Sequence, residues 1–321
     1  MKVVIIGGVA GGATAAARLR RLDEQAEIVM LERSGYVSYA NCGLPYYVGG
    51  VITDQEELTL QTPESFRRRF AVDVRVRHEA TAIDPARKTV TVRRLEDGSE
   101  YEEAYDKLLL SPGARPLRPA LPGVESARVF TLRTVEDTLR LHTFIQSSAP
   151  RSAVVVGGGF IGLEMMENLT HQGIQVTVVE KQRQVMAPID YDMACGIHAY
   201  LRDHRLKLRL KETIEGFSKR NGRLLTLLKG REPVESDFVI LAIGVLPETK
   251  LAKEAGLALG AKDAIVVNER METSKPDIYA VGDAVEVRHY VTGEKALIAL
   301  AGPANKQGRI AADNICGGDS V

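Results

Sequence analysis

The sequence of 321 residues contains no tryptophan, only three cysteines and no net charge. Cys42, Cys195 and Cys316 are too few and too far apart for a disulfide scaffold or a CxxC metal site, so no bound metal is expected. Basic and acidic residues balance at 42 each, which argues against a surface that binds nucleic acid or an anionic membrane. No apolar run approaches the roughly 18 residues of a membrane helix. Because Met1–Ile6 is typical of a strand and leaves no room for a signal peptide, we expect a cytoplasmic protein.

What the sequence does contain is one pattern that occurs twice. In each copy a β-branched strand leads into a glycine-rich turn, a helix, and a second strand that ends on an acidic residue. The first copy consists of Lys2–Ile6, then Gly7, Gly8, Val9, Ala10, Gly11 and Gly12, then Ala13–Leu22, Glu27–Leu31 and Glu32. The second consists of Ala153–Val156, the turn from Gly157 and Gly159 through Phe160 and Ile161 to Gly162, a helix through Leu169, and Gln175–Val179 with Glu180. This order predicts two dinucleotide-binding units, although Val9 replaces the middle glycine of the first turn.

Each copy continues into a charged, alternating region with a hairpin turn, Asp97-Gly98 in the first and Asn221-Gly222 in the second. An apolar strand then ends at Ser111-Pro112-Gly113 in the first copy and at Gly244 in the second. The predicted fold class is therefore α/β, with two Rossmann-like dinucleotide-binding domains that each carry a three-stranded β-meander insertion.

A late buried strand within Asp277–Ala284 indicates how the two domains are connected. Strands of this kind join an existing parallel sheet, and we expect this one to return to the first domain. The second domain, residues 118–247, would then be inserted into the first, which would consist of residues 1–117 and 248–321.

Two dinucleotide sites in one chain suggest two different dinucleotides. Asp283, which follows Gly282 at the end of the late strand, suits a polyhydroxy chain such as flavin ribityl. Pro303, between Gly302 and Ala304, suits the first turn of a helix whose positive end would favour reduced flavin. We therefore predict FAD in the first unit and NAD(P)H in the second.

The stretch Ser38–Tyr47, SYANCGLPYY, is the most specific part of the sequence. Together with the two glycine turns, Thr273–Ala284 and Gly302–Asn314, it resembles the coenzyme A disulfide reductases and NADH-dependent persulfide reductases of the pyridine nucleotide-disulfide oxidoreductase family. The resemblance extends from Lys2 to Ile315. It implies a glutathione-reductase-like fold and an enzyme that uses FAD and NADH or NADPH to reduce a disulfide or persulfide based on coenzyme A.

Cys42 is the candidate catalytic residue. It follows the second strand where a helix can begin, and thiols at helix N-termini have more thiolate; the alternative is a buried structural cysteine. Glutathione-reductase-like relatives carry a second cysteine five positions later, where this chain has Tyr47. A mixed disulfide with substrate, or a sulfenic acid, would then replace the internal disulfide. Cys195 and Cys316 lie in helical patterns with apolar neighbours and are expected to be packing residues.

The resemblance implies further roles. Phe160 would gate the flavin face and Glu164 would approach the nicotinamide, against the plainer alternatives of helix packing and a surface charge. The remaining predicted cofactor-binding residues are Arg33, Asn41, Ser111, Pro112 and Gly113, and the predicted substrate contacts are Arg21, Ser38 and Asn41. Arg18, Arg20 and Arg67–Arg69 could meet coenzyme A phosphates or form solvated faces.

Glu180 bears on the choice of nicotinamide cofactor. Its carboxylate would repel a 2′-phosphate and so favours NADH, whereas Lys181 and Arg183 could accommodate that phosphate.

Two other functions stay open. An NADH oxidase or peroxidase would use a sulfenic acid on Cys42, but such relatives carry a histidine in the first glycine turn, where this chain has Ala10. A non-catalytic flavin-binding redox module is the second. Relatives also continue into a third domain that forms their homodimer, whereas this sequence ends at Val321, so it resembles their first two domains.

Overall fold

The computed structural model describes residues 1–321, which form two compact units. The first comprises Met1–Tyr39, Thr59–Arg115 and Leu246–Val321; the second comprises Ala40–Leu58 and Pro116–Val245. The segment Ala40–Leu58 thus groups with the second unit, whereas the sequence analysis assigned it to the first domain. The reason is that its helix, α2 (Leu44–Val48), packs on helices of the second unit.

A parallel five-stranded sheet, in the order β19-β7-β1-β2-β3, forms the centre of the first unit. Its strands are β1 (Lys2–Ile6), β2 (Glu27–Glu32), β3 (Asp73–Val76), β7 (Lys107–Leu110) and β19 (Ile278–Ala280). Strands covered on both faces read as continuous apolar runs, and β1, β2 and β7 do so. β19 pairs with β7, with Ile278 opposite Leu108, which confirms that the late strand joins the first sheet.

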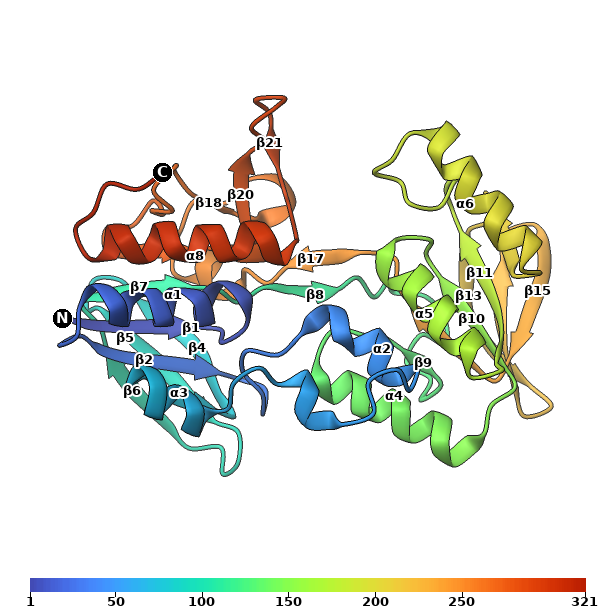
Figure 1. Cartoon of the computed structure of the whole chain (residues 1–321), viewed down its shortest axis with the longest axis horizontal. Helices are drawn as coiled ribbons and strands as arrows, with labels where there is room; N and C mark the ends of the chain where they lie inside the picture. The colour runs from blue at the N-terminus through green and yellow to red at the C-terminus, as the bar shows by residue number, and fades with distance from the viewer. The chain divides into compact units, whose positions relative to one another are not determined.

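Two helices of the first unit, α1 (Ala10–Leu22) and α8 (Ala301–Ile315), lie side by side (Figure 1). Glycines permit this approach, because a Cβ on Gly308 would lie 2.5 Å from the carbonyl oxygen of Gly11. The packing therefore fixes α8 against the glycine turn from which α1 starts.

The second unit repeats the arrangement with a parallel sheet in the order β12-β11-β10-β16-β9. Its strands are β9 (Val129–Phe130), β10 (Ser152–Val156), β11 (Gln175–Glu180), β12 (Lys207–Leu210) and β16 (Phe238–Leu241). Its helices are α2 (Leu44–Val48), α4 (Val135–Ser148), α5 (Phe160–His171) and α6 (Tyr191–Asp203). Two Rossmann-like sheets confirm the predicted α/β fold class.

Both meanders are present as antiparallel three-stranded sheets. They are β4 (His78–Asp84), β5 (Thr89–Arg94) and β6 (Glu100–Ala104), and β13 (Ile214–Arg220), β14 (Arg223–Leu228) and β15 (Arg231–Ser236). The second hairpin turns at Asn221 and Gly222, both with positive φ, as a type I′ turn requires.

The remaining α-helices and strands are α3 (Pro63–Phe70), α7 (Lys250–Glu254), the pair β8 (Ala114–Pro116) and β17 (Val245–Pro247), and the sheet of β18 (Ile265–Val266), β20 (Val285–Arg288) and β21 (Lys295–Ala296).

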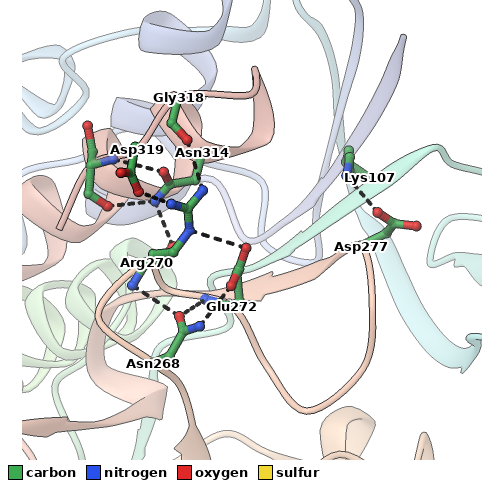
Figure 2. A network of polar contacts seen from close by, with 9 residues as sticks. Lys107, Asn268, Arg270, Glu272, Asp277, Asn314, Gly318 and Asp319 are labelled. Carbon is green, nitrogen blue, oxygen red and sulfur yellow. Dashed lines mark hydrogen bonds and ion pairs between the residues drawn. The ribbon is translucent and has the colours of Figure 1, made fainter.

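A polar network around Arg270 ties the residues after α8 to the loop before β19 (Figure 2). The Arg270 guanidinium donates to the carbonyl oxygen of Gly318 at 2.8 Å and pairs with Asp319 and Glu272. Asn314 Nδ2 donates to the carbonyl oxygen of Arg270 at 3.0 Å. The C-terminal residues are therefore part of the first unit's fold.

Asp277 closes the same loop at the start of β19. Its carboxylate oxygens lie 2.6 Å from Lys107 Nζ and 2.6 Å from Lys88 Nζ (Figure 2 draws the first contact). Hydrogen bonds from Lys107 and Lys88 lower the pKa of Asp277. Its φ is +64°, a conformation that asparagine also adopts readily.

Asp277→Asn is expected to lower the free energy of unfolding by about 1 kcal/mol at pH 7. A lowered native pKa stabilises the fold above the unfolded-state pKa, and this contribution is lost as the pH falls through the native value. The difference from wild type should therefore shrink below about pH 4. Urea unfolding at pH 7 and pH 3 measures it, with the exposed Asp203→Asn as control. A difference that is equal at both pH values would contradict the ion-pair explanation.

Candidate active site

The first glycine turn follows the carboxyl end of β1, beside the carboxyl end of the neighbouring strand β7. The strand order of the sheet reverses at this point, which is where Rossmann folds bind ligands. Gly7 has a φ of +97°, and a Cβ there would lie 2.0 Å from the carbonyl oxygen of Ser111. A Cβ on Gly12 would lie 1.9 Å from the carbonyl oxygen of Gly7. Neither position accepts a side chain, so the turn holds the strand end, the helix start and Ser111 in close contact.

Hydrogen bonds join this turn to the predicted acidic residue. Glu32, which is buried, accepts from the Gly8 backbone N–H at 2.9 Å and from the Ser34 N–H at 2.8 Å. Ser111 Oγ accepts from the Gly12 N–H at 3.1 Å. The carboxylate is thus fixed at the end of β2, beside the turn, where a ribose hydroxyl could donate to it.

A pocket of about 310 Å³ opens beside the turn in the first unit. Its lining includes four predicted cofactor-binding residues, Gly7, Glu32, Arg33 and Pro112. Further lining residues come from the first meander, from α7 and from the loop before α7, and were not predicted: His78, Glu79, Thr81, Arg93, Glu248 and Lys250. No motif marks them, because only the folding of the meander against the sheet brings them to the pocket.

The Gly282-Asp283 pair lies close to Ser111, which contacts the first glycine turn. A Cβ on Gly282 would lie 3.8 Å from both Ala304 Cβ and Ser111 Oγ, and the Gly282 N–H donates to Gln307 Oε1 at 2.7 Å. Gln307 was missed by the sequence analysis, as it lies within α8 outside any motif. Asp283 follows in a 3₁₀ turn, Gly282–Ala284. Gly302 and Pro303 lie in the first turn of α8, as predicted, and Gly113 has a φ of +70°.

The second glycine turn has the same geometry. Cβ atoms on Gly157 and Gly162 would lie 2.3 Å from the Ala242 carbonyl oxygen and 2.0 Å from the Gly157 carbonyl oxygen. The Gly158 N–H donates to Glu180 at 2.6 Å, as Gly8 does to Glu32.

The backbone at the middle position of the two turns explains why Val9 can replace the glycine of the motif. Gly159 has a φ of −82° and nothing within 4 Å of its Cβ position, and Val9 has a φ of −100°. Since neither position has the positive φ that favours glycine, valine can occupy it. Gly244, at the end of the neighbouring strand, has a φ of +115° and also faces open space.

Side chains that follow the second turn lie open to solvent. Phe160 is 56% exposed and Ile161 is 37% exposed, which is unusual for large apolar side chains at a helix start. Partial burial, with a contribution from Glu167, raises the pKa of Glu164 one turn further along α5. The exposure of Phe160 argues against the packing alternative and leaves its face available to a ligand.

Cys42 is an exposed free thiol in the 3₁₀ turn Asn41–Gly43, immediately before α2. The side-chain oxygen of Asn41 is buried and has no hydrogen-bond partner. Buried polar atoms are normally paired, so this oxygen suits a donor on a bound ligand. Tyr47 occupies the place of a second cysteine; it is buried, with its ring 5.0 Å from the ring of His142.

The other two cysteines differ from each other. Cys316 packs against the core of the first unit, as predicted. Cys195 is exposed on α6, so the prediction that it packs is wrong. Its helix buries Ala194 and Leu201 instead, which turns position 195 outward.

Three of the arginines considered for phosphate contacts are already engaged. Arg20 donates to five backbone carbonyl oxygens around the end of α1, Arg18 pairs with Asp313, and Arg67 with Asp73. Arg21 is exposed on α1. The Ser38 backbone N–H donates to the carbonyl oxygen of Gly8 at 2.8 Å, so Ser38 lies next to the glycine turn in space.

No helix has the length and apolar composition needed to cross a bilayer.

Two Rossmann-like units, each with a glycine turn hydrogen-bonded to an acidic residue, define a protein of the dinucleotide-binding class. The family model for pyridine nucleotide-disulphide oxidoreductases matches residues 1–308. The chain belongs to this family of enzymes, whose members bind FAD and NAD(P)H.

Individual relatives refine the comparison. The chain is 36% identical over all 321 residues to the coenzyme A disulfide reductase of Staphylococcus aureus (strain JH9), covering 72% of that protein. Against the structure of reduced Bacillus anthracis CoADR-RHD it has 50% identity and a TM-score of 0.95, over 98% of this chain and 57% of that one. Against the structure of the NAD-dependent persulfide reductase from A. fulgidus it has 38% identity and a TM-score of 0.96, over 100% of this chain and 60% of that one. The chain therefore spans about three fifths of these two solved proteins.

Proposed function

We propose that the chain is an FAD-dependent NAD(P)H oxidoreductase that reduces coenzyme A disulfide, or a coenzyme A persulfide, through Cys42. The observation that carries the proposal is the exposed thiol of Cys42 without a neighbouring cysteine in its motif, beside the unpartnered oxygen of Asn41. The substrate class is supported by the relatives, one of which is named for coenzyme A disulfide and another for persulfide.

The two units divide the binding of the cofactors. The first would hold FAD through Gly7–Gly12, Glu32 and Asp283, and the second would hold NADH through Gly157–Gly162 and Glu180. The Gly7 and Gly12 positions, which exclude any side chain, and the pocket beside Glu32 support a dinucleotide in the first unit. Bound FAD would supply two-electron redox chemistry between the nicotinamide and sulfur.

Cys42 carries the reaction at sulfur. Its thiolate attacks one sulfur of R–S–S–R, the S–S bond breaks, RS⁻ leaves, and a Cys42–S–S–R mixed disulfide forms. Two electrons from NAD(P)H and one proton then cleave this bond, releasing RSH and restoring the thiolate. One NAD(P)H and one proton are consumed for each disulfide and two thiols are formed; with a persulfide the leaving group is HS⁻. Arg21, Ser38 and Asn41 would contact the coenzyme A moiety.

Anaerobic assays of the FAD-loaded protein test this proposal. NADH consumption is followed with coenzyme A disulfide, coenzyme A persulfide, glutathione disulfide and hydrogen peroxide in turn. Preferred turnover of a coenzyme A substrate is the expected result. Preferred turnover of peroxide would favour the sulfenic acid mechanism, against which Ala10 argues. Flavin reduction without any turnover would identify a redox-binding module.

Glu180→Gln is expected to reduce the preference for NADH over NADPH by about tenfold. The wild-type carboxylate lies at the end of β11 and would repel a 2′-phosphate, whereas the amide is neutral. Arg183, which could compensate, lies over the Tyr191 ring at 4.4 Å. Stopped-flow rates of flavin reduction by each nucleotide give the ratio, and Glu212→Gln after β12 is the control. An unchanged ratio would remove Glu180 from the specificity site.

A further inference from the structure

The segment that carries Cys42 is docked on α5, the helix that starts at the second glycine turn. α2, which begins two residues after Cys42, lies against α5 and α4 (Figure 1). A Cβ on Gly49, at the end of α2, would lie 2.1 Å from Asn168 Oδ1 and 2.6 Å from Asn168 Cβ. Gly49 has a φ of −73°, so it is glycine because of this close approach and not because of its backbone conformation.

Asn168 is rigid at this contact. Its side chain is 1% exposed, and its Nδ2 donates to the carbonyl oxygen of Glu164, one turn earlier in α5, at 2.8 Å. If the side chain swung away to admit movement of Gly49, its own buried amide would lose this hydrogen-bond partner.

A second contact holds the end of α2. Gln172, the residue after α5, donates from Nε2 to the carbonyl oxygen of Val48 at 2.6 Å. This carbonyl belongs to the last turn of α2, where helix carbonyls lack partners within the helix. Four of the five residues of α2 are buried, and Cys42 lies two residues before the helix begins.

A charged residue of α5 also affects Tyr46 of α2 electrostatically. The carboxylate of Glu164, followed by partial burial, Glu167 and Cys42, raises the pKa of Tyr46. Cys42, Tyr46 and Glu164 thus form one electrostatic neighbourhood within the second unit.

We propose that Asn168 and Gln172 are positioning residues that tie Cys42 to α5, so that nucleotide binding at the start of α5 changes the reactivity of the Cys42 thiol. The inference rests on the proposed function for the identity of the nucleotide site and of the redox thiol. The coupling runs through one rigid helix, whose first residues follow Gly159 and whose last turn holds α2. The contacts between Gly49 and Asn168 and between Val48 and Gln172 join α2 to the end of this helix.

Site-resolved alkylation tests the coupling. The FAD-loaded protein is treated anaerobically with iodoacetamide, with and without saturating NAD⁺, and modification of each cysteine is followed by mass spectrometry. Cys195, exposed on α6, is an internal reference for general loosening. Gln172→Glu keeps the side-chain shape but removes the donor to Val48, and Gln146→Glu, exposed on α4, is the matched control.

We expect NAD⁺ to change the Cys42 modification rate at least about twofold in wild type and in Gln146→Glu, and to have no effect in Gln172→Glu. Without nucleotide, Gln172→Glu should change the Cys42 rate about fivefold, the equilibrium effect of one lost hydrogen bond, and leave Cys195 unchanged. Asn168→Ala should change the Cys42 modification rate in the same direction as Gln172→Glu does. An NAD⁺ effect that survives in Gln172→Glu, or that is absent in wild type, overturns the coupling. Failure of the proposed function is seen separately, as NADH-dependent disulfide turnover that does not need Cys42.

Discussion

Replacement of Cys42 by serine is expected to reduce turnover of coenzyme A disulfide at least about 10³-fold while leaving NADH-dependent bleaching of the flavin intact. A serine oxygen forms no disulfide, so the mixed disulfide cannot be made, whereas neither glycine turn is altered. Cys42 is exposed in a 3₁₀ turn, so the exchange of sulfur for oxygen leaves the packing of the second unit unchanged. Steady-state NADH consumption and single-turnover flavin reduction, both anaerobic, separate the two effects.

Cys195→Ser is the matched control, since that thiol is also exposed but lies on α6. It should retain wild-type turnover. Cys42→Ser with more than about a tenth of wild-type activity would show that electrons reach the substrate without a cysteine intermediate, and the mechanism proposed above would have to be abandoned.

Gly12→Ala and Gly162→Ala should separate the two nucleotide sites. The added methyl group would lie 1.9 Å from the Gly7 carbonyl oxygen in the first case and 2.0 Å from the Gly157 carbonyl oxygen in the second. Both contacts are with backbone, so the helix must move away from the strand, which costs about 1–3 kcal/mol and opens the turn. Gly12→Ala is expected to weaken FAD binding at least about 100-fold, and Gly162→Ala to keep FAD but weaken NADH binding as strongly.

Flavin content after purification, fluorescence titration with FAD, and the NADH dependence of flavin reduction measure these effects. Gly196→Ala is the control, because it lies exposed within α6 with nothing within 4 Å of its Cβ position and replaces glycine by a better helix former. Loss of NADH binding in Gly12→Ala with FAD retained would show that the two units hold the cofactors in the opposite assignment.

The repeated core of this protein can be predicted from local sequence patterns. The boundaries of β1, the two glycine turns and both hairpin turns agree with the structure, because periodicity and turn chemistry act over a few neighbouring residues. The lone Cys42 motif is likewise visible in one short stretch, and the late strand was assigned to the first sheet from its apolar character alone.

The residues that surround these motifs are brought there by packing between distant parts of the chain. His78 and Arg93 reach the pocket because a meander folds back onto the sheet, and Gln307 reaches Gly282 because α8 packs on α1. Cys195 points outward because its helix buries a different face. The grouping of the Cys42 segment with α5 depends on Gln172 and Val48, which are 124 positions apart. Such contacts arise from packing between distant segments, and no local pattern in the sequence encodes them.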